Sequence, residues 1–392
     1  MIRSLYITYM GLTEPLLYSQ ALNYLKSLSR KGIRINILSF EKKEFLTETS
    51  IEAIKSDLGN FGIKWTHLIY HKRFKIISKP YDVIKGMIFS MYLSLKENLD
   101  VIHVRGTMCG LMAVPAYSFL RKKVIFDMRG LMAEEYVDGN LWKRNSFFYK
   151  CVNALERYLI NKYDEIVVLT DKIKDLFIYK YDITDVSVIP TCVDLEKFSF
   201  NRMHDKLNKK FTIIYTGSVG TWYMLTEMVN FFKILYESDR DTIFIILSQA
   251  DKKSIEQNIP LNIRKNIIIK SVKPLEVNAY LNESDMGMFF IKPCFSKSAS
   301  SPTKFAEYLA CGLPVIINSG VGDTDLLVRK HRIGVIVDSF TESGYRKAAS
   351  ELKELLKEGM VLKNRCRKVA EDYFSLELGA ERYFEIYKKL KQ

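Results

Sequence analysis

Short apolar runs rich in β-branched residues alternate with helix-forming stretches along nearly the whole chain. In the first helix-forming stretch Leu22, Leu25 and Leu28 recur three positions apart, as they do on one face of a helix. Such alternation is typical of α/β proteins, because two parallel strands need a crossover connection that is usually a helix. The predicted strands are 3–9, 33–40, 101–104, 124–126, 166–169, 186–189, 211–215, 243–247, 267–269, 286–291, 315–317 and 335–337.

The alternation is interrupted once, by a polar and basic stretch from Asn201 to Lys210. At 392 residues the chain is too long for a single core and fits two domains of roughly 150–200 residues each. We therefore expect two doubly wound α/β domains. The predicted boundaries are 1–198 for the first domain, 199–210 for a linker, 211–372 for the second domain and 373–392 for a terminal helix.

Composition and cysteine usage describe a compact globular protein. Hydrophobic residues make up 48% of the chain and no low-complexity tract is present, so disorder is not expected. The six cysteines show neither a C-x-x-C pair nor a zinc-site spacing, and the N-terminus lacks the core of a signal peptide. We therefore expect a reducing, cytoplasmic setting. No apolar run approaches the roughly 18 residues that span a bilayer.

The charge is strongly basic. Lysine and arginine number 59, aspartate and glutamate 45, and the formal net charge is +14. A surplus of this size attracts polyanions. Zinc fingers, RNP-type aromatic motifs and continuous basic arms are absent from the sequence, so nucleic acid is not the expected partner. A diphosphate substrate or an anionic membrane surface explains the charge equally well.

The stretch from Ser301 to Ile316 carries the most functional information. Pro302 suits the first turn of a helix, where its missing N–H costs nothing, and Gly312 suits the left-handed residue that ends one. The predicted helix is therefore only about ten residues long.

This short helix combines an anion site with a carboxylate. Its N-terminal amides carry roughly half a positive charge, and Ser301, Thr303 and Lys304 add hydroxyl and ammonium donors for a phosphate. Glu307 lies one turn further on and can accept hydrogen bonds from a sugar diol. Phosphate and diol together suggest a nucleotide sugar. The alternative interpretation is a capped amphipathic helix with an exposed glutamate.

The stretch resembles the donor-site signature of the retaining glycosyltransferases of family four. Residues 190–198, with the sequence PTCVDLEKF, resemble the segment that closes the first domain in that superfamily, and the Gly217 loop falls in the expected order. The resemblance implies the GT-B fold, with two Rossmann-like domains, a deep interdomain cleft and a terminal helix crossing back to the first domain. It also implies a nucleotide-sugar donor and a lipid-linked or saccharide acceptor in bacterial surface-polysaccharide synthesis.

The sequence departs from the family pattern in two places. Ala299 stands where the first glutamate of a Glu-x7-Glu pattern is common, and the loop from Gly217 to Tyr223 lacks the basic pair that holds the diphosphate in many relatives. Lys304, or Lys292 and Lys297, are the candidates to replace that pair. By the resemblance, the backbone near Val272 and Lys273 holds the nucleobase, although a solvated loop lysine is the simpler interpretation of Lys273. The candidate donor-binding residues are Gly217, Ser218, Val272, Lys273, Ser301, Thr303, Lys304 and Glu307.

Other candidates follow strand ends in the first domain, where open α/β sheets bind their ligands. His103 is a candidate for the chemistry, and a half-buried histidine beside an aspartate is an equally good interpretation. Arg129 is a candidate for binding the acceptor or a phosphate, with a local pair to Asp127 as the alternative. Gly11 and Gly217 allow close backbone approach or simply a turn. The candidate catalytic residues are His103, Arg129 and Lys304, and the acceptor-side candidates are Gly11, Arg105 and Asp127.

We expect neither a metal nor another cofactor. The sequence lacks a D-x-D-like motif at a strand end, and helix amides with Lys304 are able to stabilise a leaving diphosphate. Hydrolase, zinc-protease and P-loop motifs are absent as well. Two rival functions stay open, a nucleotide-sugar epimerase with the same fold and a non-catalytic subunit.

Residues 65–99 combine basic residues with a predicted helix that carries apolar side chains at helical spacing. Such spacing is most often that of a core-facing helix. The alternative is peripheral docking on an anionic bilayer, at the inner face of the cell membrane. The basic residues are Lys72, Arg73, Lys75, Lys79 and Lys85, and the apolar ones are Ile84, Met87, Ile88, Met91, Tyr92 and Leu95.

Overall fold

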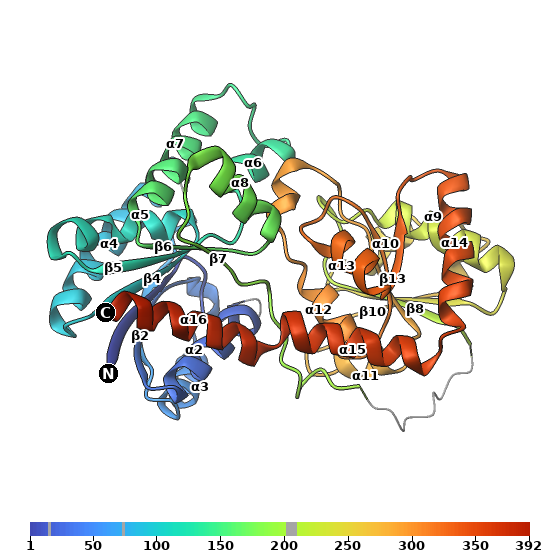
Figure 1. The fold of residues 1–392 in the computed structure, drawn as a ribbon, viewed down its shortest axis with the longest axis horizontal. Coiled ribbons are helices and arrows are strands. Elements are labelled where there is room, and N and C mark those ends of the chain that lie inside the picture. Colours follow the sequence, from blue (N-terminus) through green and yellow to red (C-terminus); the bar gives the residue numbers. More distant parts are fainter. Residues whose placement is uncertain (15–16, 73–74, 201–209) are drawn as a thin grey trace. The chain divides into compact units, whose positions relative to one another are not determined.

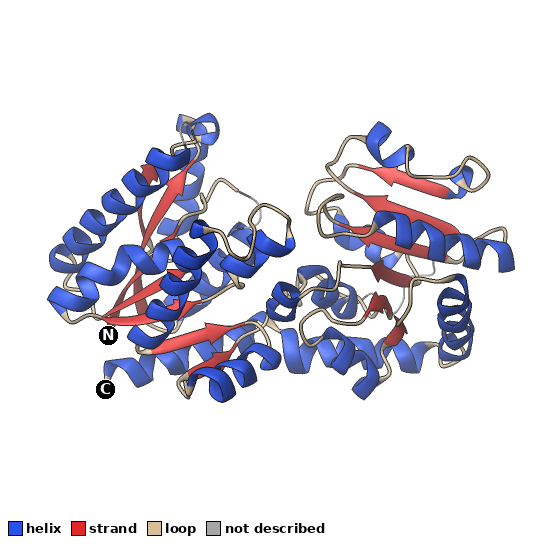
Figure 2. Ribbon diagram, turned by 90° about the horizontal axis from the view of Figure 1, so that it is seen from above, coloured by secondary structure: helices blue, strands red, loops and turns tan. Residues whose placement is uncertain are grey.

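A computed structural model describes residues 1–14, 17–72, 75–200 and 210–392. The chain forms two compact units, Met1–Pro190 together with Leu376–Gln392, and Thr191–Ser375 (Figure 1). Each unit is a parallel sheet with helices on both faces (Figure 2). The prediction of two Rossmann-like α/β domains is therefore confirmed.

The first unit contains a seven-stranded sheet in which all strands are parallel. The strand order reverses between β1 and β4, so this is the topological switch point at which open α/β sheets bind ligands. In sheet order the strands are β3 (Lys64–Ile69), β2 (Ile33–Glu41), β1 (Ile2–Thr8), β4 (Val101–Arg105), β5 (Lys123–Asp127), β6 (Glu165–Val168) and β7 (Val186–Val188).

Helices connect these strands, and the terminal helix α16 also packs on this unit, against α2 and the sheet. Tyr387 of α16 lies 3.0 Å from the Ser4 hydroxyl, and Arg382 donates to the Val188 carbonyl at 3.1 Å. The predicted return of the terminal helix to the first domain is confirmed. The helices are η1 (Tyr18–Leu22), α2 (Asn23–Arg30), η2 (Lys43–Phe45), α3 (Glu48–Gly59), α4 (Lys75–Lys96), α5 (Thr107–Leu120), α6 (Met132–Asp138), α7 (Phe147–Lys162), α8 (Asp171–Tyr181) and α16 (Leu376–Lys391).

The second unit contains a six-stranded parallel sheet whose order reverses between β8 and β11. The strands in sheet order are β10 (Ile267–Lys270), β9 (Ile243–Leu247), β8 (Thr212–Thr216), β11 (Met286–Phe289), β12 (Val315–Asn318) and β13 (Gly334–Val337). The helices are α9 (Leu225–Ser238), α10 (Lys252–Glu256), η3 (Arg264–Asn266), α11 (Val277–Asn282), η4 (Phe295–Ala299), α12 (Thr303–Ala310), α13 (Thr324–His331), α14 (Glu342–Leu356) and α15 (Met360–Phe374).

Each predicted strand has a counterpart in the structure, and β3 is the strand that the sequence analysis missed. Its sequence, KWTHLI, buries only Leu68, so it shows no clear apolar alternation. The second unit begins at Thr191, before the predicted boundary at 198, because Val193 N–H donates to Phe374 O at 2.7 Å and Arg367 binds the Phe198 carbonyl. Most of the predicted linker, 201–209, lies outside the described residues.

The sequence analysis favoured a core-facing orientation for the apolar side chains of helix α4, and this prediction is wrong for most of them. Ile84, Ile88, Tyr92 and Leu95 are 51–63% exposed, and Met87 and Met91 are half-buried. Of the basic residues nearby, Lys72 is exposed, Lys79 and Lys85 are half-buried, and Arg73 and the Lys75 side chain lie outside the described part of the structure. None of the helices in the described ranges is long and apolar enough to cross a membrane.

Candidate functional site

Helix α12 is as short as its sequence predicts. It spans Thr303–Ala310, directly after Pro302, and Gly312 follows in the left-handed region at φ +70°. The Tyr308 hydroxyl accepts the backbone N–H of Thr216 at 2.8 Å, and a side chain at Gly287 would overlap the Tyr308 ring. The helix is therefore anchored at the carboxyl end of β8 and against β11, the two strands of the switch point.

Lys304 is the central cation of this site. Its side chain is buried, and its Nζ lies 3.7 Å from the centre of the Tyr223 ring and 4.3 Å from that of Tyr215. The ammonium donates to the Tyr215 hydroxyl at 3.3 Å. Burial lowers the pKa of Lys304 well below its usual value, while the carboxylate of Glu307 opposes the shift. The ammonium group is thus poorly solvated and contacts mainly ring faces, so a bound anion would favour its charged form.

The Gly217 loop lies directly against this amine. Gly217 has φ +135°, and a Cβ at this position would lie 2.7 Å from Lys304 Nζ. The Tyr215 hydroxyl also donates to the Ser218 carbonyl, so one side chain links the loop to the lysine. Gly217, Ser218 and Lys304, predicted as donor-binding residues from distant parts of the sequence, are neighbours in the structure.

Aromatic residues stand in the loop where the sequence lacks the expected basic pair. Trp222 covers the largely buried Lys297, whose Nζ is 3.9 Å from the ring, just as Tyr223 covers Lys304. The positive charges of the site therefore come from the segment before and within α12, and the loop supplies rings that hold them. The sequence analysis named both lysines but not their aromatic partners, since the pairing is made only by the tertiary fold.

Glu307 lies one turn beyond Lys304 and is half-buried. Burial raises the pKa of Glu307 to about 7, against the opposing charges of Lys304 and Lys197. A carboxyl group with this pKa exists in both forms near neutral pH. As a carboxylate it can accept hydrogen bonds from a ligand's hydroxyl groups.

Ser301 and Thr303 flank Pro302 at the start of α12, and both are half-buried. The Ser301 hydroxyl accepts the backbone N–H of Thr191 at 3.0 Å, which ties the first residue of this unit to the helix. The hydroxyl retains its own proton for donation, so this bond is compatible with a ligand contact.

The backbone near Val272 is bonded within the protein. The Val272 carbonyl accepts from the Gln249 side chain at 2.8 Å, and the Lys273 N–H donates to Glu276 at 2.7 Å. The Lys273 side chain is exposed. A nucleobase held here would have to take over bonds from Gln249 or Glu276. The sequence analysis named neither Gln249 nor Glu276. Gln249 could have been found, because it follows the carboxyl end of β9, where open α/β sheets bind ligands.

In the first unit the structure gathers charged residues at the carboxyl ends of β4 and β5. Asp127 lies between two guanidinium groups, with Arg105 and Arg129 each 3.6 Å from one of its oxygens. Burial alone would raise the pKa of Asp127, but Arg129, His103 and Arg105 together lower it to about 2. Arg105 also donates to Gln20 at 2.7 Å.

His103 lies behind this cluster and is 2% exposed. Its Nδ1 is 3.0 Å from the Tyr387 hydroxyl of α16, and its Nε2 is 3.9 Å from Asp127 Oδ2. Burial lowers the pKa of His103, against the effect of Asp127, so the ring is neutral at pH 7. The geometry is that of an interior histidine packed under the terminal helix.

A pocket of about 240 Å³ opens beside the cluster, and both Arg105 and Arg129 line it. Beneath it Glu156 accepts the Thr107 hydroxyl at 3.0 Å and the Met132 N–H at 2.8 Å, which joins the starts of α5 and α6. Burial raises the pKa of Glu156 to about 7. The lining residues are Tyr9, Arg105, Gly106, Thr107, Met108, Arg129, Gly130, Met132 and Glu135.

Gly11 follows β1 on the other side of the switch point. A side chain here would overlap the carboxylate of Glu41, which accepts the backbone N–H of Leu12 at 2.7 Å and of Thr13 at 3.2 Å. The position of the Glu41 carboxylate is enough to explain why residue 11 is a glycine, and the explanation needs no bound ligand. Glu41 is a buried residue that the sequence analysis did not single out.

Within the described residues, His, Cys, Asp and Glu side chains form no group of three or more that could hold a metal ion. The charged groups at the two switch points are Lys304 with Glu307 in the second unit and the Asp127 cluster in the first.

Comparisons with known proteins identify two matching domain families. Residues 19–197 match the family described as Glycosyltransferase Family 4, and residues 296–374 match the Glucosyltransferase 3-like, C-terminal domain. The first match covers most of the unit with the Arg105–Arg129 pocket. The second contains α12 with Lys304 and Glu307. Among curated protein sequences none matches the chain.

Solved structures of similar fold cover both units. Sucrose-phosphate synthase from Thermosynechococcus elongatus is 12% identical, with a TM-score of 0.74 over 100% of this chain and 99% of that one. A glycosyltransferase from Rickettsia africae is 14% identical, with a TM-score of 0.73 over 99% and 98%. HepE from Anabaena, in complex with UDP and glucose, is 12% identical, with a TM-score of 0.68 over 99% and 100%. The fold is GT-B, as the sequence predicts.

Proposed function

We propose that the protein is a glycosyltransferase that moves a sugar from a nucleotide-diphosphate sugar to a hydroxyl group of an acceptor, with retention of configuration. One observation carries the proposal. The buried amine of Lys304 lies against Gly217 at the switch point of the second sheet, with the Glu307 carboxyl one turn further on. The two glycosyltransferase domain matches support the same class of enzyme.

In this proposal the second unit binds the donor. Lys304 and the N-terminal amides of α12 stabilise the negative charge that develops on the leaving diphosphate, in a site where burial strengthens electrostatic interactions. Glu307 binds the ribose diol. Neither role requires a metal ion or another cofactor. HepE, of similar fold, was solved with UDP and with UDP-glucose, so uridine nucleotides are the first donors to test here.

The first unit binds the acceptor. Its pocket presents guanidinium groups of Arg105 and Arg129, which suit hydroxyl-rich or phosphate-bearing acceptors. We infer a saccharide or lipid-linked acceptor in surface-polysaccharide synthesis, from the resemblance of the Ser301–Ile316 stretch. The six cysteines, all in the described part of the chain, are not joined in disulfides, and we propose a reducing cytoplasm as the setting of the protein.

A two-stage experiment tests the function. Nucleotide sugars are first screened by thermal shift, since a ligand at 100 times its dissociation constant stabilises a protein by about 2.7 kcal/mol. The donor that binds is then incubated with the protein, with and without lipid and saccharide acceptors, and in the presence and absence of EDTA.

We expect transfer that depends on the acceptor and survives chelation. Conversion of the donor without an acceptor would indicate an epimerase instead. Binding without turnover on any acceptor would indicate a non-catalytic subunit, an outcome to which the buried Ala299 in place of a glutamate draws attention. Activity lost with EDTA and restored by magnesium or manganese would contradict the role given to Lys304.

A further inference from the structure

Helix α4 departs from the usual distribution of polar and apolar residues, although Val83 and Leu93 on it are buried. A helix on the surface of a soluble protein normally buries its apolar stripe and exposes polar side chains. Here Ser78, Asp82, Ser90 and Ser94 are buried, while a stripe of large apolar residues is exposed. That stripe consists of Tyr81 (52% exposed), Ile84 (56%), Ile88 (61%), Tyr92 (51%) and Leu95 (63%).

The stripe is continuous and lies on one side of the helix. Its members are separated by three or four positions, so their side chains follow one another along a single face. On the opposite face α4 packs against α5, where a side chain at Gly86 would overlap Met112. The inward direction is therefore set by α5, and the apolar stripe faces outward, where Tyr81 meets the edge of the His71 ring and the Lys96 ammonium lies 5.3 Å from the centre of the Tyr92 ring. Contiguous exposed apolar surface of this kind marks an interaction site.

The charge around the stripe is positive. Helix α4 contains Lys79, Lys85 and Lys96 and a single acidic residue, Asp82. That aspartate is buried and accepts hydrogen bonds from the Tyr9 hydroxyl at 2.9 Å and from His71 N–H at 3.1 Å. On the surface of α4 the basic side chains therefore have no acidic residue of their own helix to offset them.

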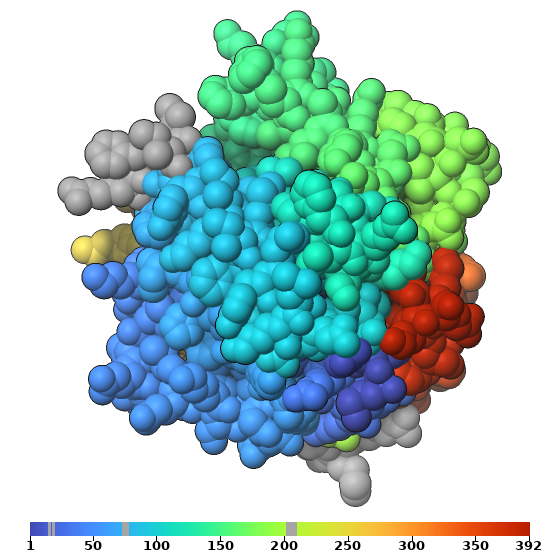
Figure 3. All heavy atoms as spheres, turned by 90° about the vertical axis from the view of Figure 1, so that its left-hand side faces the viewer, coloured from blue at the N-terminus to red at the C-terminus, as the bar shows by residue number. Residues whose placement is uncertain are grey.

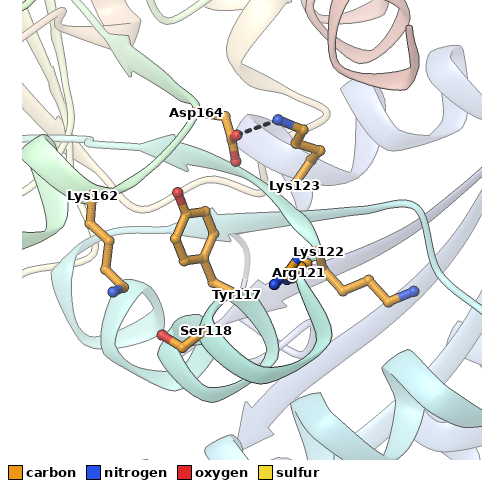
Figure 4. A pocket seen from close by; sticks show the side chains of 7 residues that line it. All are labelled: Tyr117, Ser118, Arg121, Lys122, Lys123, Lys162 and Asp164. Atoms are coloured by element: carbon orange, nitrogen blue, oxygen red, sulfur yellow. Dashed lines mark hydrogen bonds and ion pairs between the residues drawn. The ribbon is translucent and has the colours of Figure 1, made fainter.

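A second basic group lies at the end of the neighbouring helix. Helix α4 ends at Lys96 and is followed by β4, and α5 ends at Leu120 and is followed by β5. The first residues of these two strands, Val101 and Lys123, are paired, so both helices end at the same edge of the sheet. There a pocket of about 460 Å³ is lined by basic residues with one acidic residue, Asp164, bonded to Lys123 (Figure 4). The basic residues are Arg121, Lys122, Lys123 and Lys162.

An exposed apolar residue also lies near the end of α5. Phe119, two residues before Arg121, is 78% exposed. Figure 3 views the side of the first unit on which α4 and α5 lie next to each other at the surface. Large apolar side chains flanked by lysines and arginines match a layer of acyl chains beneath anionic headgroups.

We propose that the exposed face of α4, with Phe119 and the basic residues Lys96, Arg121 and Lys122, docks the protein on a bilayer containing anionic lipids. A second copy of the chain is a poorer occupant, because a twofold interface would bring the same positive charges together. The inference rests on the proposed function in one respect: docking brings the enzyme to a lipid-linked acceptor.

Co-sedimentation with vesicles tests the surface without requiring turnover. The protein is mixed with vesicles of phosphatidylcholine alone or of phosphatidylcholine with phosphatidylglycerol, at low and high salt. We expect binding to the anionic vesicles that weakens with salt. UDP binding, measured in parallel by calorimetry, reports on the proposed function separately. UDP binding without vesicle binding would overturn the docking surface and leave the function standing.

Two variants separate apolar from electrostatic contributions. The first variant removes apolar side chains, by Ile84→Ser/Ile88→Ser/Leu95→Ser, and the second reverses charges, by Lys96→Glu/Arg121→Glu/Lys122→Glu. Each variant should lower the vesicle partition coefficient on the order of tenfold or more. The matched controls are exposed residues of the second unit, Leu261→Ser/Leu275→Ser and Lys233→Glu/Lys253→Glu/Lys353→Glu, which should bind like the parent. Folding of each variant is checked by circular dichroism.

If the variants and their controls lose vesicle binding equally, the assignment is overturned. The loss would then reflect the net charge or the overall hydrophobicity of the protein, and not this surface. The proposal also fails if light scattering shows a dimer that the triple serine variant abolishes while vesicle binding is unaffected. In that case the stripe is an interface between two copies.

Discussion

The two units differ in the partners that surround their buried charged side chains. In the first unit the buried Asp127 carboxylate lies 3.6 Å from each of two arginines, so each guanidinium group has a direct ionic partner. In the second unit Lys304 has a tyrosine hydroxyl and ring faces around its amine, with a carboxyl group one turn away. An ion-paired cluster belongs to the fold that holds the pocket, whereas a lysine without a direct ion pair gains most from a ligand with negative charge.

The largest expected effect is on the ion-paired cluster of Asp127, Arg105 and Arg129. Asp127→Asn would leave the Arg105 and Arg129 side chains, only 10% and 14% exposed, without the buried carboxylate that pairs with both, which should cost about 3–5 kcal/mol of stability. Denaturant unfolding measures the loss. The control is Asp338→Asn, whose partner Arg329 is exposed, and which should cost at most about 1 kcal/mol. Similar costs for both variants would mean that the cluster is not a structural centre.

Lys304→Met should show the opposite behaviour. It removes a desolvated amine, so stability should stay equal or rise, while the affinity for UDP should fall by about 1.5–3 kcal/mol. Calorimetry and denaturant unfolding measure the two quantities. Lys330→Met is the matched control, because Lys330 also lies over a tyrosine ring, that of Tyr373, but is exposed. An unchanged UDP affinity in Lys304→Met would remove this residue from the donor site.

Glu307→Ala should weaken UDP binding by about 1–3 kcal/mol with little effect on folding, because in the proposed function the carboxylate accepts hydrogen bonds from the ribose diol. The sharper test compares UDP with its 2′,3′-dideoxy analogue. The parent should distinguish the two nucleotides and the variant should not, as in a double-mutant cycle. If the variant still prefers UDP by the full margin, the diol binds elsewhere.

The smallest effect concerns Glu156, beside the pocket that Arg105 and Arg129 line. Burial raises its pKa to about 7, so the folded protein keeps a proton that the unfolded chain loses near pH 4.5. Stability from this group is therefore present at low pH and lost as pH rises through about 7, by about 1 kcal/mol between pH 6 and 8. Glu156→Gln should flatten that part of the stability–pH curve. An identical slope in both proteins would show that Glu156 does not titrate in this range.

Local patterns predicted the parts of the site that depend on neighbours in sequence. Pro302 and Gly312 delimit α12, and their preferences hold whatever surrounds the helix. Strand ends predicted where Arg105, Asp127 and Gly217 lie, because parallel strands place their carboxyl ends along one edge.

Contacts between distant segments could not be predicted in this way. The ring of Tyr223 over Lys304 and the hydroxyl of Tyr387 beside His103 join residues far apart in the chain. Glu41, which requires a glycine at position 11, looks like any strand-end glutamate in the sequence. Periodicity cannot identify such partners, since it reports only which residues share a face.

Helix α4 shows most clearly what the sequence determined and what the tertiary structure determined. The sequence by itself determined that Ile84, Ile88, Tyr92 and Leu95 share one side of a helix, because their spacing matches its turn. Only the tertiary structure decided that this side faces outward. Its packing against α5 at Gly86 turns the small and polar face inward, so the apolar stripe is exposed.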